Sequence, residues 1–468
     1  MHMTPYLLAA AAAVVAGPAA AADPVSILFV GNSYTFGRLD PVLSYNAANV
    51  RDLTQPQGPL VVGSTASTPK FSDVTGTNSY GPGMINPTTG VHGNSYSPHT
   101  QTNGWGGVAG IFKQLTVQAG LNYDVALSTR NAATLRGHLI NSANSVNWDL
   151  RGNISSQKWA KMILQEQSDE ALGPQTVNGV ALGSNFPAIR AHVDLIEDWV
   201  HTGKVTIAPG LTAVTSYTEE AMYIAQYGSV DACVAAGGTK RASAGAPAGS
   251  CDNRATRNLG VNANASLATE IYLQQTWARP NLINSPGTPT INPATGDAVY
   301  DTTKPVPSYF NSLEAMTSEM STGMLKVADY ADDDGSSGIT EIIPVGQAFL
   351  AAVQAGVATR DMYAADASTD QLIDLWFNDG THASVAGSYL SALTNFGSVT
   401  GLDPAMFGAN EIAARDLGLS QSDALALQRV ASLTLGHTAP VPEPSTVALM
   451  LAGLAGIAAL ARKRRAEG

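Results

Sequence analysis

The segment Val25–Val30 (VSILFV) forms a continuous apolar strand pattern near the start of the chain. Such a run is typical of a strand that is buried on both faces, as in a parallel sheet covered by helices. Tyr123–Ser128 and Trp159–Gln165 read as further strands, while Val108–Ala119 and Phe186–His201 have helical spacing. This alternation predicts an α/β fold with a central parallel sheet and right-handed crossovers.

The second half of the chain continues the alternation. Of two apolar segments, Lys204–Ala208 and Ala268–Thr276, the second is the better candidate for a core strand, centred on Glu270–Gln275. Pro307–Tyr330 and Pro344–Gln354 are expected to be helical. Two long loop insertions, at about 54–106 and 212–266, interrupt this pattern, and insertions of this length are usually functional or mobile.

The composition excludes one class of partner. Charged residues make up 13% of the chain, which is about half the usual share, and the net charge is −12. A nucleic-acid partner is not expected, because neutralising phosphates requires clustered Lys and Arg. The low charge indicates a surface of neutral polar loops, as in many exported bacterial proteins.

The first 22 residues have the order of a secretory signal peptide. An apolar run is followed by small residues, with cleavage expected near Ala22. The segment before the run lacks Lys and Arg, so a first transmembrane anchor is the alternative. Export agrees with the two cysteines, Cys233 and Cys251, which we expect to form a disulfide worth about 3 kcal/mol. A metal site is disfavoured there, because no His lies nearby.

Residues 441–468 contain a Pro-Glu-Pro box at Pro442, Glu443 and Pro444, an apolar segment at about 446–461, and a basic tail. This order resembles the PEP-CTERM sorting signal of Gram-negative bacteria. The resemblance implies recognition by an exosortase-type enzyme, passage through the inner membrane, and release or anchoring at the cell surface. An ordinary C-terminal membrane anchor is the alternative. Both interpretations place the main domain outside the inner membrane.

Ser33 lies in the sequence Gly31–Gly37 (GNSYTFG), directly after the first strand. Nucleophiles and ligands of open parallel sheets lie beyond the carboxyl ends of the strands. Taken alone, the serine could equally be a helix N-cap. A second group, Asn378–Ser384 (NDGTHAS), precedes a segment of helical spacing at Val385–Leu393. There, Asp379 and His382 are three residues apart and can act together to deprotonate one serine, although an ordinary turn has the same composition.

Together the two groups resemble the first and last sequence blocks of the SGNH (GDSL-like) hydrolases, in the branch with Gly-Asn-Ser-Tyr-Thr. The resemblance implies a three-layer α/β/α flavodoxin-like fold over about residues 23–400, with 401–440 as an extension or linker. It also implies that Ser33 is the nucleophile, His382 the general base and Asp379 its partner.

The middle blocks depart from the family pattern. The second block usually supplies a Gly N–H to the oxyanion hole, but the corresponding segment here contains Asn131 and Ala132 instead. The third block usually supplies an Asn side chain, and Gln167 falls at its place, with Gln165 as the second choice. Both glutamines could equally be structural. The expected oxyanion hole therefore consists of Ser33, Gln167 and Asn131.

These features predict an exported serine esterase or deacetylase that needs no metal or cofactor. Its expected substrate is a small-molecule or carbohydrate ester, with O-acyl sugars as one candidate. Two residues after the later core strand, Trp277 and Arg279, are candidates for the cleft. The alternative is a non-catalytic cell-surface or extracellular-matrix protein on an SGNH scaffold, because the second block lacks its Gly and the insertions are large.

Overall fold

The computed structural model describes residues 23–37, 40–53, 105–140, 150–291, 298–333 and 335–437. The predicted signal peptide, most of the insertion at 54–106 and the C-terminal segment 441–468 lie outside these ranges. Within them, no helix combines the length and the apolar character needed to cross a bilayer. The predicted membrane segment at about 446–461 is not among the described residues.

A six-stranded parallel sheet forms the centre of the molecule, in the order β12-β9-β4-β1-β3-β2. Its strands are β1 (Val25–Gly31), β2 (Arg51–Asp52), β3 (Tyr123–Thr129), β4 (Lys161–Gln165), β9 (Glu270–Gln274) and β12 (Glu341–Ile343). In β1, residues 27–30 are at most 1% exposed, so the predicted burial on both faces is confirmed. Val30 is level with Ser128 of β3 and Leu164 of β4, so the residues that follow these three strands meet at one edge.

The chain changes direction across the sheet at β1. From β1 it runs to the edge strand β2 and then through α2 (Gly107–Gln118) to β3. From β3 it crosses back to β4 through α3 (Leu135–Ile140) and α4 (Leu150–Ile154). Without the two-residue edge strand β2, the order matches a doubly wound, flavodoxin-like sheet. In such sheets a ligand crevice forms beyond the carboxyl ends of the strands at the change of direction, which here are β1 and β4.

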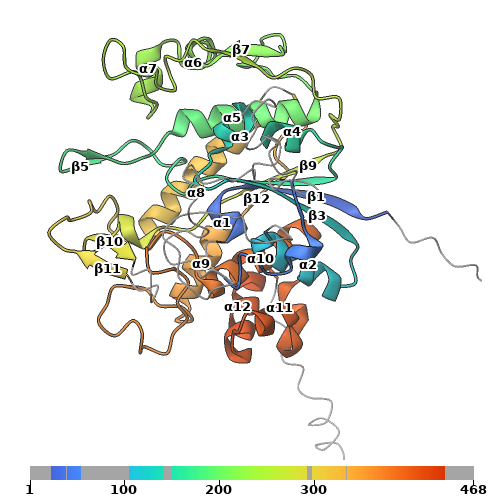
Figure 1. Ribbon diagram of the computed structural model, residues 1–468, viewed down its shortest axis with the longest axis vertical. Coiled ribbons are helices and arrows are strands. Elements are labelled where there is room, and N and C mark those ends of the chain that lie inside the picture. Colours follow the sequence, from blue (N-terminus) through green and yellow to red (C-terminus); the bar gives the residue numbers. More distant parts are fainter. Residues whose placement is uncertain are drawn as a thin grey trace, which may run out of the picture.

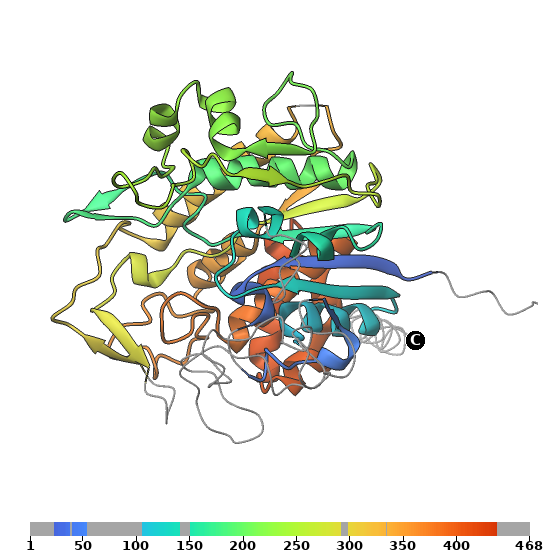
Figure 2. The same cartoon turned by 45° about the horizontal axis from the view of Figure 1, so that its top comes forward.

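Helices cover both faces of the sheet, which gives a three-layer α/β architecture (Figure 1). Ile27 and Phe29 face the layer with α2, α9 (Val345–Gln354) and α10 (Val385–Thr400). Leu28 and Val30 face the layer with α3 and α5 (Phe186–His201). The long helix α8 (Leu313–Ala331) packs along α5. In Figure 2 the two layers lie on opposite sides of the strands.

Most predicted elements agree with the structure, and the differences have local causes. α8 begins at Leu313 rather than at Pro307, because the Ser312 side chain accepts the N–H of Ala315 and caps the helix there. Lys204–Ala208 is not a core strand, since Val205 makes only an isolated bridge to Val214. Short elements complete the fold: η1 (Ala47–Asn49), β5 (Thr176–Val177), β6 (Val180–Ala181), η3 (Pro280–Leu282), β10 (Thr288–Ile291) and β11 (Ala298–Asp301).

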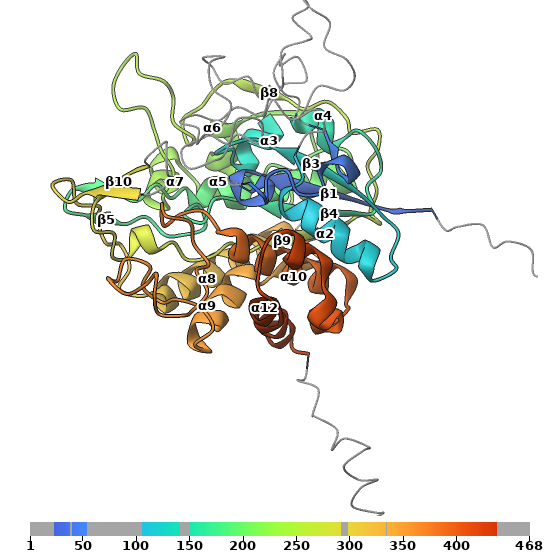
Figure 3. The ribbon, with the colours of Figure 1, turned by 60° about the horizontal axis from the view of Figure 1, so that its bottom comes forward.

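The segment expected to be an extension or linker, 401–440, is folded as far as it is described. It contains η4 (Pro404–Asn410), α11 (Ile412–Asp416) and α12 (Gln421–Thr434). Leu427 and Ala431 of α12 are fully buried in the same core cluster as α10. Figure 3 shows α12 beside α9 and α10. Of the two interpretations, extension and linker, the packing of these residues fits an extension, because their apolar side chains complete the layer that contains α9 and α10.

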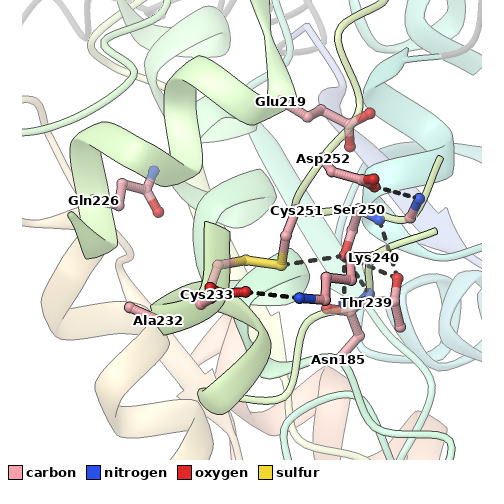
Figure 4. The surroundings of a disulfide bond; sticks show 12 residues. Asn185, Glu219, Gln226, Ala232, Cys233, Thr239, Lys240, Ser250, Cys251 and Asp252 are labelled. Carbon is pink, nitrogen blue, oxygen red and sulfur yellow. Dashed lines mark hydrogen bonds and ion pairs between the residues drawn. A yellow bond between two sulfur atoms is a disulfide. The ribbon is translucent and has the colours of Figure 1, made fainter. Parts of the chain in front are cut away.

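The insertion at 212–266 forms β7 (Ser216–Thr218), α6 (Glu219–Tyr227), α7 (Val230–Ala235) and β8 (Thr256–Asn258) on the outer side of α5 (Figure 1). The predicted disulfide is present between Cys233 and Cys251, whose side chains are fully buried (Figure 4). Beside it, the Cys251 N–H donates to the carbonyl of Thr239 at 2.8 Å. The disulfide thus joins α7 to the returning chain in a region with little regular structure.

Candidate active site

Ser33 begins the four-residue helix α1 (Ser33–Phe36) at the carboxyl end of β1. The Asn32 side chain caps this helix by accepting the N–H of Tyr34 at 3.1 Å. A Cβ at Gly31 would lie 2.4 Å from both the Oε1 of Gln165 and the Oγ1 of Thr35. A larger residue at position 31 would therefore displace the Gln165 and Thr35 side chains from the bonds that hold this turn.

Gln165 holds this turn rather than facing the pocket. Its Oε1 accepts the N–H of Asn32 at 3.0 Å and the hydroxyl of Thr35 at 2.8 Å, while its Nε2 donates to the carbonyl of Glu166 at 2.6 Å. The side chain is fully buried. The Gln165 amide thus fixes the end of β1. Gln165, the second choice for an oxyanion donor, does not line the pocket.

The turn at Asn378–Ser384 brings His382 and Asp379 to Ser33. The Oγ of Ser33 lies 2.8 Å from the Nε2 of His382, and the Nδ1 of His382 lies 2.7 Å from the Oδ2 of Asp379. The other carboxylate oxygen accepts the N–H groups of Thr381 and His382, each at 2.9 Å. Since Asp379 can only accept when ionised, Nδ1 carries the proton and Nε2 accepts from the serine hydroxyl.

Gly380 and two aromatic rings set the position of this turn. Gly380 has a φ of +65°, and a Cβ there would lie 2.1 Å from the hydroxyl of Tyr363. The indole N–H of Trp277 donates to the carbonyl of Thr381 at 2.9 Å. Tyr34 packs edge-on against the His382 imidazole, with ring centroids 5.5 Å apart. Trp277 is fully buried, so it supports the histidine turn and does not line the cleft.

A pocket of about 390 Å³ lies over Ser33 and His382. The expected oxyanion residues Asn131 and Gln167 both line it together with Ser33. Ala132 has a φ of +53°, in the left-handed region, which marks a tight turn after β3. The wall is mostly polar and consists of Ser33, Asn131, Ala132, Thr134, Gln167, Asp169, Glu170, Gly183, Arg279, Thr381 and His382.

Three ionisable side chains of this wall lie just after strands of the sheet, Asp169 and Glu170 after β4 and Arg279 after β9. Arg279, expected in the cleft, is there and forms an ion pair with Asp169 at 2.9 Å. Burial, with a further contribution from the Asp169 carboxylate, raises the pKa of Glu170 to about 8. Sequence reasoning missed Asp169 and Glu170, although their position directly after Gln167 and Ser168 at the end of β4 would have indicated them. Within the described ranges, no group of three or more His, Cys, Asp or Glu is arranged to hold a metal ion.

Comparisons with known proteins identify the C-terminal signal. Residues 440–465 match the model of the PEP-CTERM protein-sorting motif, which confirms the prediction from Pro442, Glu443 and Pro444. The chain therefore carries a signal for export and sorting in Gram-negative bacteria, read by an exosortase-type enzyme. No curated protein matches the sequence. The chain is similar to the crystal structure of a DUF4886 family protein from Bacteroides uniformis, with 11% identity, 89% of this chain and 96% of that chain covered, and a TM-score of 0.36.

Proposed function

We propose that this exported protein is a serine esterase or deacetylase on an SGNH-type scaffold. The observation that carries the proposal is the continuous hydrogen-bonded chain from the Ser33 hydroxyl through His382 to Asp379. A serine, an imidazole and a carboxylate in this arrangement form a nucleophile, a general base and the group that orients the base.

The reaction follows from these contacts. The Nε2 of His382 takes the hydroxyl proton as the Oγ of Ser33 attacks the ester carbonyl carbon, and Asp379 stabilises the imidazolium that forms. When the tetrahedral intermediate collapses, His382 gives this proton to the departing alcohol, which leaves an acyl group on Ser33. A water molecule then attacks the acyl carbonyl, with His382 again as base, and releases the acid and the free serine.

The oxyanion of the tetrahedral intermediate needs hydrogen-bond donors. The Ser33 N–H is at the first position of α1, where helix N–H groups have no partner within the helix. Asn131 and Gln167 line the wall of the same pocket. We assign the oxyanion hole to the backbone N–H groups of Ser33 and Asn131 and to the side-chain amide of Gln167. Removal of one such donor typically lowers turnover by about 10²–10³-fold.

The pocket wall supports a polar ester as the substrate. Asn131, Thr134 and Gln167 offer amide and hydroxyl groups, and the Asp169–Arg279 pair adds a charge-balanced polar surface. A small-molecule or carbohydrate ester, such as an O-acyl sugar, would satisfy these groups better than a long apolar chain. This assignment also agrees with a protein that works outside the inner membrane.

The test is reactivity at Ser33. The protein should hydrolyse p-nitrophenyl acetate and be labelled by a fluorophosphonate probe, and Ser33→Ala should abolish both. Ser432→Ala is a matched control, because Ser432 is also buried but lies in α12. An unlabelled wild type, or equal labelling of Ser33→Ala, would contradict the proposal and favour the alternative of a non-catalytic surface protein.

A further inference from the structure

Glu166 is a buried carboxyl that the proposed reaction does not use. It directly follows Gln165, the last residue of β4, and is only 1% exposed. A buried carboxyl needs hydrogen-bond partners, because an unpaired one costs several kcal/mol. Its contacts therefore indicate what it does at the edge of the sheet where the proposed active site lies.

Each carboxyl oxygen of Glu166 accepts a backbone N–H from a different segment. Its Oε2 accepts the N–H of Leu135 at 2.7 Å, and its Oε1 accepts the N–H of Gln167 at 2.9 Å. Leu135 is the first residue of α3, which follows β3, whereas Gln167 follows β4. β1 lies between these two strands, so Glu166 connects segments that the sheet itself does not join.

These two segments carry the proposed oxyanion donors. Gln167 is one of them, and the turn that ends at Leu135 contains Asn131. The start of this turn is fixed to β1, because the Arg130 N–H donates to the carbonyl of Gly31 at 3.2 Å. Its middle is held by the Asn32 side chain, which donates to the carbonyl of Ala133 at 3.1 Å. The bond from Leu135 to Glu166 fixes the end of the turn.

We propose that Glu166 is a positioning residue that sets the spacing between the Asn131 and Gln167 donors of the oxyanion hole. This inference rests on the proposed esterase function. Oxyanion donors act only within about 2.7–3.1 Å of the developing charge, so a small relative movement of the two segments removes most of their effect. A displacement of about 1 Å in such a site can cost about 10²-fold in rate.

The environment of Glu166 suits this role. Burial, together with the neighbouring Glu170 carboxylate, raises the pKa of Glu166 well above its usual value. A raised pKa favours the uncharged form of this carboxyl, and less negative charge on Glu166 means less electrostatic opposition to an oxyanion nearby.

Glu411 provides a matched control. It is 3% exposed, and its two oxygens accept the N–H groups of Ala413 and Ala414 at 2.7 and 2.6 Å. It caps α11 and does not line the pocket. Glu411→Gln and Glu166→Gln thus remove the same kind of interaction, because an amide nitrogen cannot accept an N–H. Only the second change acts on the segments beside Ser33.

The experiment compares kcat and KM for p-nitrophenyl acetate, with thermal unfolding as the measure of stability. We expect Glu166→Gln to lower kcat by about 10–100-fold with little change in KM. Glu411→Gln should lower the melting temperature but keep kcat within about 2-fold. If the two variants have equal kcat values, the inference is wrong. An inactive wild type would instead contradict the proposed function itself.

A double-mutant cycle separates positioning from general damage. If Glu166 acts through the Gln167 donor, the loss caused by Glu166→Gln should be several-fold smaller when Gln167 is already Ala. Fully multiplicative losses would overturn the proposal. If Glu166→Gln does not fold, Glu166→Asp replaces it in both measurements. It keeps the carboxyl but shortens the side chain by one methylene, and it should also lower kcat rather than raise KM.

Discussion

The indole N–H of Trp277 donates to the carbonyl of Thr381, the residue immediately before His382, at 2.9 Å. Trp277 itself is stacked on Phe349, with centroids 4.8 Å apart and planes at 12°. Trp277, which follows β9, thus connects the turn that contains His382 to the layer of α9. The position of the proposed base depends on this contact as well as on Asp379.

Trp277→Phe tests this support. The change keeps an aromatic ring against Phe349 but removes the hydrogen bond to Thr381, so His382 should lose part of its alignment. We expect kcat for p-nitrophenyl acetate to fall about 10-fold and stability to fall by about 1–2 kcal/mol. The control is Trp159→Phe, since the Trp159 indole also donates to a backbone carbonyl, that of Ile154 at 2.9 Å. An equal loss of kcat in both variants would contradict a specific role.

Gly31→Ala should disrupt the turn that carries Ser33, the proposed nucleophile. The new methyl group would lie 2.4 Å from the Gln165 and Thr35 side chains that hold Asn32, so these bonds must break or the turn must move. We expect at least about a 10²-fold loss of kcat and a destabilisation of about 1–3 kcal/mol. Gly137→Ala in α3 is the control, because the nearest atom to its Cβ would be at 3.6 Å. That variant should be neutral or slightly more stable.

The sequence predicted the parts of the site that local pattern determines. An apolar strand followed by Gly-Asn-Ser placed Ser33 at a strand end, and Asp-Gly-Thr-His placed His382 in a turn before a helix. Neither pattern could show that the Gln165 amide oxygen accepts the N–H of Asn32 and holds it in place. That contact spans more than a hundred residues of sequence and depends on the pairing of β1 with β4.

The packing of residues 401–437 was not predicted for a similar reason. The mean hydropathy of α12 is low, and its buried Leu427 and Ala431 show their partners only after α10 is in place. β12 has three residues, too few for a periodic signal. The start of α8 depends on the capping side chain of Ser312, and the end of α10 depends on the left-handed Gly401. Hydrophobic periodicity locates neither residue.

Glu170→Gln tests the raised pKa of Glu170. In the folded protein the group keeps its proton up to a pKa of about 8, whereas in the unfolded chain it loses it near its ordinary value of 4.5. The folded state therefore binds more protons between these values, and this group makes stability fall as pH rises through that window, by up to about 1.4 kcal/mol per pH unit. Urea unfolding at pH 5 and pH 7.5 should show that Glu170→Gln gains stability relative to the wild type at the higher pH. An unchanged difference between the two pH values would refute this.

Glu219→Gln tests the opposite case, a buried carboxylate that must be ionised. Glu219 begins α6, is fully buried, and its Oε2 accepts from the guanidinium groups of Arg136 at 2.7 Å and Arg257 at 2.6 Å. Burial pushes its pKa upward, but the hydrogen bond from Arg136 and the surrounding positive charge outweigh it and leave the pKa below its usual value. The amide would leave two arginines without a counter-charge, so we expect a loss of about 3 kcal/mol at pH 7.

The sign of the pH effect distinguishes this residue from Glu170. A carboxyl whose folded pKa is lowered contributes stability above its unfolded value of 4.5 and loses it as pH falls through the folded pKa. The wild type should therefore converge with Glu219→Gln in acid. Glu220→Gln is the control, because its partner Arg254 is exposed and such pairs contribute little. Since the insertion lies on the outer side of α5, kcat of the folded fraction of Glu219→Gln should stay within about 3-fold of the wild type.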